Sequence, residues 1–472
     1  MRNDPSCKPS RSPRFWRCGW VILILPLTLG GCSQGPSPGP TVKLPASFSG
    51  NGIQATPDRW WRSFKDARLN QLESQALTRN FSLESSWQRL RQARAVVARE
   101  NADLFPDLSA SADGQANAGG DPNPNQPRLG LGLGLGLRAN YEADLWGRIR
   151  DEIKAEKNRA RASLADYRTA ALTLSAEVAR TWYALVEAWE QRDLIKDQIG
   201  TNEKILKQLQ VRLSEGQGRS VDVLRQQGLV RATREQLTVA ESNLGILGNR
   251  LAVLQGRAPE SIIGPSKQSL PNLPPPPRTG LPVRLVQRRP DIIGALSRVR
   301  AADADLAAAI KNRLPRLNFR MSYTNTEDEI ARLFQNWIAV LVGELAAPMI
   351  DGGERKAEVE RTRARRAELL ADYQQAVLLA VREVEDNLIR ERQQEKRITE
   401  IQGQLDLATR SYRQLLSEYL NGASGFLDAL DSLTREQELR RDLLTARRNL
   451  IEFRIGLHRA LAGGFTTSRE LQ

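Results

Sequence analysis

The side chains that most often carry out chemistry in proteins are scarce in this chain of 472 residues. It has a single histidine, His458, and three cysteines, Cys7, Cys18 and Cys32. The sequence contains no serine, histidine and aspartate set, no cluster with metal-ligand spacing and no glycine-rich phosphate loop. We therefore expect no enzymatic activity, no bound metal and no cofactor. Cys32 is the one reactive position that the sequence context singles out.

Cys32 follows a segment that is typical of protein export. Five basic side chains precede the apolar run "WVILILPLTL" (residues 20–29), which is too short to span a membrane. The run leads into "LGGC", which resembles the lipobox of bacterial lipoproteins. This resemblance implies that residues 1–31 are a signal peptide and that Cys32 carries N-acyl and S-diacylglycerol lipid. We interpret residues 32–59 as a lipidated, extended segment, and Ser33, in place of aspartate, favours the outer membrane.

The charge of the chain gives no indication of a nucleic acid partner. The formal net charge is +14, and removal of residues 1–31 takes away five positive charges and one negative charge, which leaves +10. Arg and Lys alternate with Glu and Asp along the sequence, a pattern typical of solvated helix faces. We expect no nucleic acid binding.

Two long stretches without proline and an internal repeat predict the architecture. No proline lies between Pro127 and Pro259 or after Pro348, so long uninterrupted helices can form in both stretches. "LADY" occurs at residues 164–167 and again at 370–373, an offset of 206 that continues for about eighty residues without an insertion. The chain is therefore a duplicated unit.

Each copy is expected to contain a helix, two strands, a very long helix, a tight turn and a returning helix. Repeat 1 is assigned to residues 60–262, with strands near 107–117 and 129–145 and a tip turn near 214–222. Its long helix begins at Arg148 and spans roughly 100 Å at 1.5 Å per residue. Apolar residues spaced by 3, 4 and 7 along its far end predict a coiled-coil seam.

The second copy follows a proline-rich linker at residues 263–282. Repeat 2 is assigned to residues 283–464, with strands near 316–324 and 337–347 and a tip turn near 420–428, and residues 465–472 form a C-terminal tail. In the two tips, Gly216 and Gly422 are predicted to adopt the positive φ that ends a helix, and Ser220 and Ser424 are candidate caps.

The run "RLGLGLGLGL" from Arg128 to Leu137 alternates with a strict period of two. A transmembrane strand needs about 9 to 11 residues with alternate side chains toward lipid. Four such strands cannot close a barrel, and open edges in hydrocarbon leave backbone groups unpaired. We therefore expect three chains to pool twelve strands. The alternative is a soluble hairpin packed on the helices.

The chain resembles the outer-membrane efflux channel family, the TolC-like proteins, in its lipidated branch that serves resistance-nodulation-division (RND) multidrug pumps. The resemblance covers nearly all of the chain after the leader. It rests on "WWRSFKDARLNQL", "YEADLWGRIR", "RRPDI", "LAAPMIDGGERK" and the two tip turns.

The resemblance implies a mainly α fold with a β-barrel portion. Three chains would form a twelve-stranded barrel in the outer membrane of a Gram-negative bacterium, continued by an α-helical tunnel through the periplasm. The expected partners are two further copies of the chain, a periplasmic adaptor protein and an inner-membrane RND transporter. The channel itself would be a passive duct for small molecules such as drugs.

Related channels close their entrance with a leucine and an aspartate after the second tip turn, which implies a gate at Leu427 and Asp431. A spacing of four places both on one helix face, so three copies would form an apolar ring and a carboxylate ring. Many relatives carry an arginine three residues after the aspartate, where this chain has Thr434 followed by Arg435. The copy-one counterpart of Asp431 is Arg225.

Two further sets of residues have expected roles. Arg288, Arg289 and Asp291 of "RRPDI" are assigned to helix capping and local pairing. The tip turns are the expected adaptor contacts, through Gly216, Ser220, Asp222, Gly422, Ser424 and Asp428.

Two other functions fit parts of the sequence. A duct for type I protein secretion would use the same architecture, and an ATP-driven exporter encoded nearby would favour it. A non-conducting coiled-coil lipoprotein that spaces the envelope would account for the helices but not for the Leu-Gly strand or the tip turns.

Overall fold

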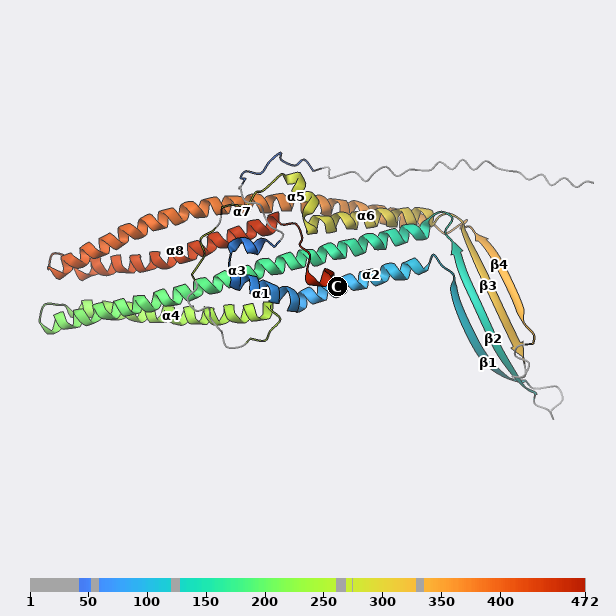
Figure 1. Ribbon diagram of the computed structural model, residues 1–472, viewed down its shortest axis with the longest axis horizontal. Helices are drawn as coiled ribbons and strands as arrows, with labels where there is room; N and C mark the ends of the chain where they lie inside the picture. Colours follow the sequence, from blue (N-terminus) through green and yellow to red (C-terminus); the bar gives the residue numbers. More distant parts are fainter. Residues whose placement is uncertain are drawn as a thin grey trace, which may run out of the picture. The chain divides into compact units, whose positions relative to one another are not determined.

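The computed structural model describes residues 42–51, 59–119, 128–259, 269–273, 275–327 and 335–471, which belong to one compact unit, Pro40–Gln472. The leader, Cys32, the loop at 120–127 and residues 260–268 and 274 at the linker lie outside the described residues. The signal peptide and the lipid on Cys32 therefore stay predictions. Figure 1 shows the arrangement of the helices and strands.

Helices dominate the described part of the chain. The two longest, α3 (Arg148–Ser214) and α7 (Glu354–Leu420), have 67 residues each. Each therefore extends about 100 Å. None of the helices in the described ranges is both long and apolar enough to cross a bilayer. The other helices are η1 (Trp60–Phe64), α1 (Ala67–Arg79), α2 (Phe81–Ala102), α4 (Ser220–Leu254), α5 (Pro282–Arg288), α6 (Pro290–Lys311), α8 (Phe426–Leu461) and η3 (Ser468–Leu471).

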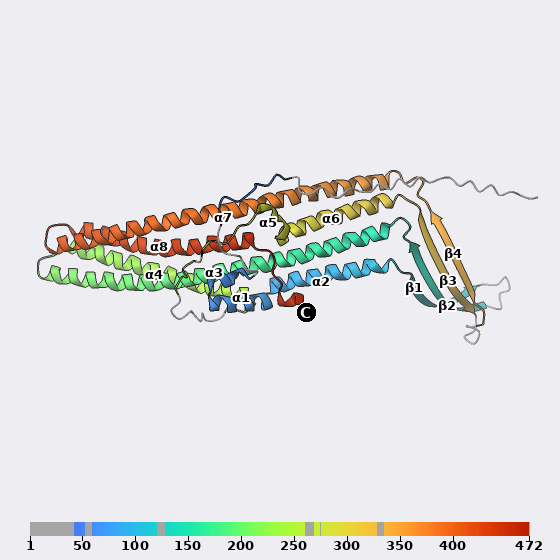
Figure 2. The same ribbon diagram turned by 45° about the horizontal axis from the view of Figure 1, so that its top comes forward.

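The helices pack in two groups along α3 and α7. Next to the strands, α2 contacts α3, α3 contacts α6 and α6 contacts α7 (Figure 1 and Figure 2). Toward the tips, α3 pairs with α4, α7 pairs with α8, and α3 also contacts α8. The second group is thus two helical hairpins that lie side by side.

The four strands form one antiparallel sheet in the order β1 (Asp107–Gly119), β2 (Arg128–Ala143), β3 (Arg316–Glu327) and β4 (Ile338–Ala346). The central pairing joins the two copies, since β2 of the first pairs with β3 of the second over Leu133 to Ala143. Within the described residues, the outer edges of β1 and β4 have no strand partner.

The junction between β2 and α3 explains why the strand is shorter than expected. The sequence predicted a strand to residue 145, but β2 ends at Ala143. Asp144 instead accepts hydrogen bonds from the backbone N–H groups of Ile149 and Arg150, both at 3.1 Å. These N–H groups belong to the first turn of α3 and have no acceptor within the helix. Asp144 therefore caps the start of α3 and does not continue the strand.

The largest core cluster lies where α1, η1 and α8 pack against the middle of α3. Trp60 is fully buried and stacks on His458, with ring centroids 5.7 Å apart. Ser63 Oγ lies 3.4 Å from Nε2 of the same ring. Burial lowers the pKa of His458 to about 3, with Arg454 contributing, so the ring is neutral at pH 7. The one histidine is therefore a packed aromatic ring in the core.

Residues 42–51 attach the N-terminal part of the chain to α7. Phe48 is buried against the core beside Leu388. The backbone N–H of Ser49 donates to Glu385 Oε1 at 2.9 Å, and its hydroxyl bonds to the other carboxylate oxygen. Gly50 O accepts a 2.8 Å hydrogen bond from Thr279 Oγ1, which ties the same segment to the end of the linker before the second copy.

Candidate functional site

The sheet has one apolar and one polar face, which follow from the strand register. Leu108, Ala139, Met321 and Leu341 lie in one row across the four strands. The next row along this face contains Leu137 and Tyr323. Leu108, Met321 and Leu341 are 71%, 51% and 73% exposed. A broad face of exposed apolar side chains is typical of a surface that contacts lipid or protein.

Polar side chains occupy the opposite face, at the alternate positions of β1 to β3. Asp107 lies beside Asn140 and Arg320 in one row, and Ser111 lies beside Gly136 and Thr324 in another. The fourth strand departs from this pattern because Ile338, Val340 and Val342 lie on the polar face.

The glycines of the Leu-Gly run leave room for side chains of the neighbouring strand. A Cβ atom at Gly134 would lie 2.6 Å from the Asp113 carboxylate, and one at Gly136 would lie 2.7 Å from Ser111 Oγ. The alternation therefore gives β2 an apolar face of leucine and a polar face supplied by β1.

The two tip turns have the same backbone geometry. Gly216 and Gly422 both have φ of 75°, which confirms the predicted left-handed conformation. The backbone N–H of the following residue donates back to the end of the long helix at 2.8 Å in each copy, from Gln217 to Arg212 O and from Ala423 to Glu418 O. Both long helices therefore end in the same glycine motif.

The predicted caps at Ser220 and Ser424 are wrong. The N-cap of α4 is Arg219 and that of α8 is Gly425, and neither forms a side-chain cap hydrogen bond. Ser220 is already the first residue of α4. The Ser424 hydroxyl lies 3.4 Å from the carbonyl oxygen of Leu415 instead.

The aspartates of the two tips differ although they occupy equivalent positions. Asp222 is buried and accepts hydrogen bonds from Arg219, with Nε 3.1 Å from Oδ2. Asp428 is exposed. Both lie in the first turn of their helices, where a carboxylate is favoured by the helix dipole. The surface that the tips offer to a partner is thus more acidic on the second copy.

The candidate gate residues Leu427 and Asp431 lie on the uncovered face of α8. Leu427 is 42% exposed and Asp431 is also exposed. The opposite face of the same turns is buried, with Phe426 2% exposed against Tyr419. Arg435 donates to Gln404 Oε1 at 3.0 Å rather than to the aspartate.

A contact near the tip connects the two hairpins. Arg212 at the end of α3 donates to the carbonyl oxygen of Leu420 at 3.3 Å, and its guanidinium carbon lies 5.3 Å from the centroid of the Tyr419 ring. Tyr419 packs in a cluster with Ile205 and Phe426. This arginine and its aromatic partner connect α3 to α7 directly beside the candidate gate.

A buried amide network joins α3, α4 and α8 farther from the tip. Asn202 Nδ2 donates to Thr233 Oγ1 at 3.0 Å, and Gln437 Nε2 donates to Asn202 Oδ1 at 2.8 Å. Gln226 Nε2 donates to Asn202 O at 2.8 Å, and Gln198 Nε2 donates to Gln437 O at 3.1 Å. This network could not be predicted from the sequence, because its members come from three helices, and α8 is far from α3 and α4 along the chain.

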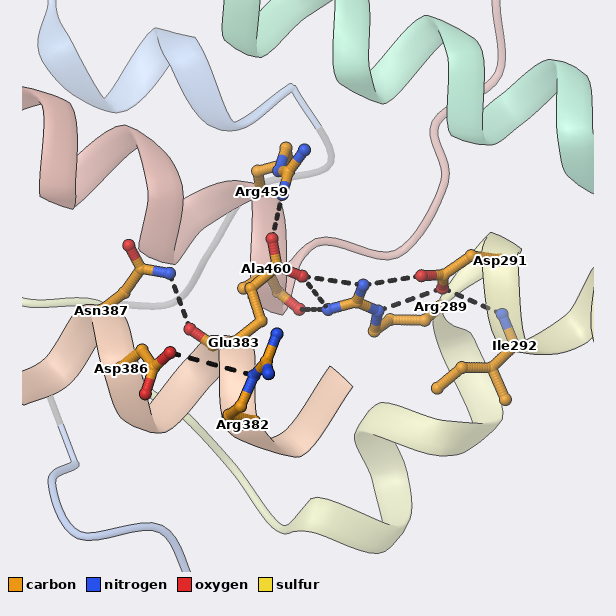
Figure 3. Close-up of polar contacts among 9 residues, drawn as sticks. All are labelled: Arg289, Asp291, Ile292, Arg382, Glu383, Asp386, Asn387, Arg459 and Ala460. Carbon is orange, nitrogen blue, oxygen red and sulfur yellow. Dashed lines mark hydrogen bonds and ion pairs between the residues drawn. The ribbon is translucent and has the colours of Figure 1, made fainter. Parts of the chain in front are cut away.

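The two arginines of "RRPDI" have different surroundings. Arg289 donates to both oxygens of Asp291 at 3.1 and 2.6 Å and to Glu383 Oε2 at 2.9 and 3.0 Å (Figure 3). It also donates to Ala460 O. Local pairing is therefore confirmed for Arg289 and Asp291. Arg288 forms no ion pair within the described residues, so local pairing is wrong for it, but it donates to the carbonyl of Leu461, the last residue of α8, which is a capping contact.

Comparison with known proteins finds relatives along nearly the whole chain. The family model described as outer membrane efflux protein matches residues 72–257 and 281–463. The pyoverdine export outer membrane protein OpmQ of Pseudomonas aeruginosa is 28% identical over 94% of this chain and 96% of its own length. The outer membrane protein OprJ of the same species is 29% identical over 98% of each chain.

Solved structures share the fold. The outer-membrane channel OprN has a TM-score of 0.84 at 24% identity, and the match covers 92% of this chain and 99% of that one. The open state of the Neisseria gonorrhoeae MtrE channel has a TM-score of 0.82 at 24% identity, with 91% and 98% covered.

Proposed function

The chain belongs to the outer membrane efflux protein family, and from this we propose that three copies assemble into a duct that passively conducts small molecules out of the periplasm. The family assignment makes the chain an outer-membrane efflux channel rather than an enzyme. The trimer, the tripartite pump and the gate are the parts that we propose.

The observation that carries the proposal is a four-stranded sheet with two faces of opposite polarity and two unpaired edges. Backbone groups at an open edge cannot remain unpaired in lipid. Pairing β4 of one copy with β1 of the next would remove both edges, and three copies would give twelve strands. The apolar face would then contact lipid and the polar face would line the lumen.

The helices would continue the duct into the periplasm. Since α3 and α7 each extend about 100 Å, the tips would lie far from the membrane. The tip residues Gly216, Ser220, Asp222, Gly422, Ser424 and Asp428 would contact a periplasmic adaptor protein. An inner-membrane RND transporter would supply the energy, because the duct has no means of its own to drive transport.

Relatives support export of small solutes. One is named as a pyoverdine export protein, and another, 23% identical, is the cation efflux system protein CusC of Escherichia coli. We propose that this chain likewise serves solutes, and that the lipid on Cys32 anchors it in the outer membrane of a Gram-negative bacterium.

The gate would lie at Leu427 and Asp431. Both are exposed on one face of α8, where three copies would place leucines and carboxylates in successive rings. Leucine rings exclude water and ions, and carboxylate rings attract cations. The resting duct is thus expected to be narrow and cation-selective.

Single-channel recording in a planar bilayer tests this function. Wild type is expected to give small, cation-selective openings, which grow in Leu427→Ala and lose cation selectivity in Asp431→Ala. Asp406→Ala is the control, because Asp406 is an exposed aspartate of α7 that already pairs with Arg410. A protein that stays monomeric in mild detergent and conducts in no variant would overturn the proposal.

A further inference from the structure

A pocket lined by arginine lies between α3 and α6. Its volume is about 580 Å³, within the range of small-molecule sites. Arg161 and Arg168 come from one face of α3, Arg288 from the end of α5 and Arg300 from α6. No carboxylate lines the pocket.

Three of these four arginines lack an acidic partner in the described part of the chain. Arg161 bonds to Asn158 Oδ1 at 3.3 Å, and Arg288 donates to the Leu461 carbonyl. Arg300 makes no hydrogen bond or ion pair there. Only Arg168 is neutralised, by Glu470 at 2.8 Å.

Other arginines close to the pocket do have acidic partners, so the lack of ion pairs is confined to the pocket. Arg289, next in sequence to Arg288, forms ion pairs with the carboxylates of Asp291 and Glu383 (Figure 3). Arg298, two residues before Arg300, pairs with Asp166. Burial lowers the pKa of Arg288, which no carboxylate opposes. The pocket therefore concentrates positive charge that nearby acids leave uncompensated.

The walls of the pocket are built by close packing. Residues 461–464 form one wall, and a Cβ atom on Gly464 would lie 3.0 Å from Pro290 Cγ and 3.2 Å from Arg168 Cδ. The segment is held in place because Tyr167 hydrogen-bonds to Thr467 at 2.6 Å. Leu164 and Ile293 add apolar surface. Pro290 opens the 22-residue helix α6, whose dipole adds positive potential there.

We propose that this pocket binds a small organic anion that carries two or more carboxylate or phosphate groups. Guanidinium groups bind both kinds of group through charge-assisted hydrogen bonds. The apolar walls would contact the carbon skeleton of the ligand. This inference goes beyond the proposed duct function, and only the exclusion of lipid headgroups as ligands rests on that function.

The place of the pocket favours a soluble ligand. Arg161 lies 13 residues after the start of α3 at Arg148, about 20 Å from the sheet, and Arg168 lies about 30 Å from it. Lipid headgroups at the edge of the proposed barrel would not reach that far. The helices that form the pocket, α3 and α6, are the inner pair of the row α2, α3, α6 and α7, so a second copy packing on the row's edges would not fill it.

The test is equilibrium dialysis of the purified full-length protein with radiolabelled citrate in low salt. We expect saturable binding, competed by inorganic phosphate and not by vesicles of phosphatidylglycerol. Arg288→Gln and Arg300→Gln should each weaken citrate binding about tenfold, since each removes a charge-assisted contact. Arg288 and Arg300 are both exposed, so both variants are expected to fold.

Arg298→Gln is the matched control, because it removes the same charge from the same helix at a residue that is already paired. It should change citrate binding less than twofold. Absence of saturable citrate binding to wild type, an equal loss in the control, or competition by the vesicles alone would each overturn the proposal. Conductance of the same samples reports the duct separately.

Discussion

Arg454 of α8 and Glu391 of α7 form an ion pair inside the helical hairpin, where their side chains are 2% and 6% exposed. Arg454 Nε lies 3.1 and 3.0 Å from the two carboxylate oxygens. A charge buried at this depth depends on its partner, because removing one member of the pair leaves the other charge buried and uncompensated.

Glu391→Gln is therefore expected to lower the free energy of unfolding by about 3 to 5 kcal/mol. The double variant Glu391→Leu with Arg454→Met should recover most of that loss. Urea unfolding followed by circular dichroism measures both. Glu358→Gln is the control on the same helix, since its pair with Arg361 is exposed, and it should change little. Equal effects of Glu391→Gln and Glu358→Gln would contradict this interpretation.

Glu73 predicts that stability falls as pH rises above about 4.5. It is fully buried in α1, and neither carboxylate oxygen has a hydrogen-bond partner within the described structure. Burial raises the pKa of Glu73 well above its usual value. The unfolded chain releases this proton near pH 4.5. Stability is therefore full below that pH and falls as pH rises toward the folded pKa.

Glu73→Leu should remove this dependence and stabilise the protein at pH 8, by roughly 1 to 3 kcal/mol. Unfolding by urea at pH 5, 7 and 8 gives the comparison. A variant whose stability changes with pH as steeply as that of wild type would show that another group is responsible.

His458 predicts the opposite response, in acid. Its folded pKa of about 3 lies below the usual histidine pKa of 6.5, so the folded protein favours the neutral ring. Stability is present above pH 6.5 and is lost as pH falls, by about 3 kcal/mol at pH 4. His458→Phe keeps an aromatic ring against Trp60 and should make the free energy of unfolding less dependent on pH below 6.5. Unfolding at pH 4, 5 and 7 tests this, and unchanged acid sensitivity would refute it.

The apolar face of the sheet predicts that a charged substitution on this face impairs membrane insertion more than one on the polar face. Leu135→Arg should impair insertion into lipid vesicles, since a basic side chain facing lipid costs about 2 to 4 kcal/mol near the bilayer midplane. Thr324→Arg is the matched variant, because Thr324 lies one residue along the ladder on the polar face. Equal insertion of both variants would argue against a lipid-facing side.

The contact of Arg212 with Tyr419 and Leu420 predicts an effect on gating. Arg212→Ala removes the one hydrogen bond and the cation–π contact that join the ends of α3 and α7 in the described structure. The hairpins should then separate more easily, and bilayer conductance should rise. Arg410→Ala, an exposed arginine on α7, serves as the control. Equal conductance in wild type and Arg212→Ala would show that this contact does not hold the tip closed.

Features that repeat along the sequence could be predicted, and contacts between distant segments could not. The absence of proline predicted α3 and α7, and the offset of 206 predicted two glycine turns with one geometry. The length of β2 was wrong at its end, because the capping role of Asp144 depends on the backbone of α3.

The neighbouring arginines of "RRPDI" and the amides around Asn202 show most clearly what could not be predicted from the sequence. Arg288 and Arg289 are neighbours in sequence, yet only one meets Glu383, which lies 94 residues away from Arg289. The network around Asn202 requires three helices to meet at one level. Neither pattern has a period or spacing that a sequence reveals.

The contact of Ser49 with Glu385 determines how much chain is left to connect Cys32 to the helical part of the protein. Glu385 lies 31 residues after Glu354, the first residue of α7, which corresponds to about 47 Å of helix. Ser49 lies 17 residues after Cys32, so a fully extended chain between them reaches at most about 60 Å. In the proposed assembly this reach exceeds the 47 Å of helix, so the predicted lipid on Cys32 would be able to reach the bilayer while Ser49 contacts Glu385. If six residues between Cys32 and Ser49 were deleted, the extended chain would be shorter than this length of helix. The protein could then keep either the lipid anchor in the bilayer or the contact of Ser49 with Glu385, but not both.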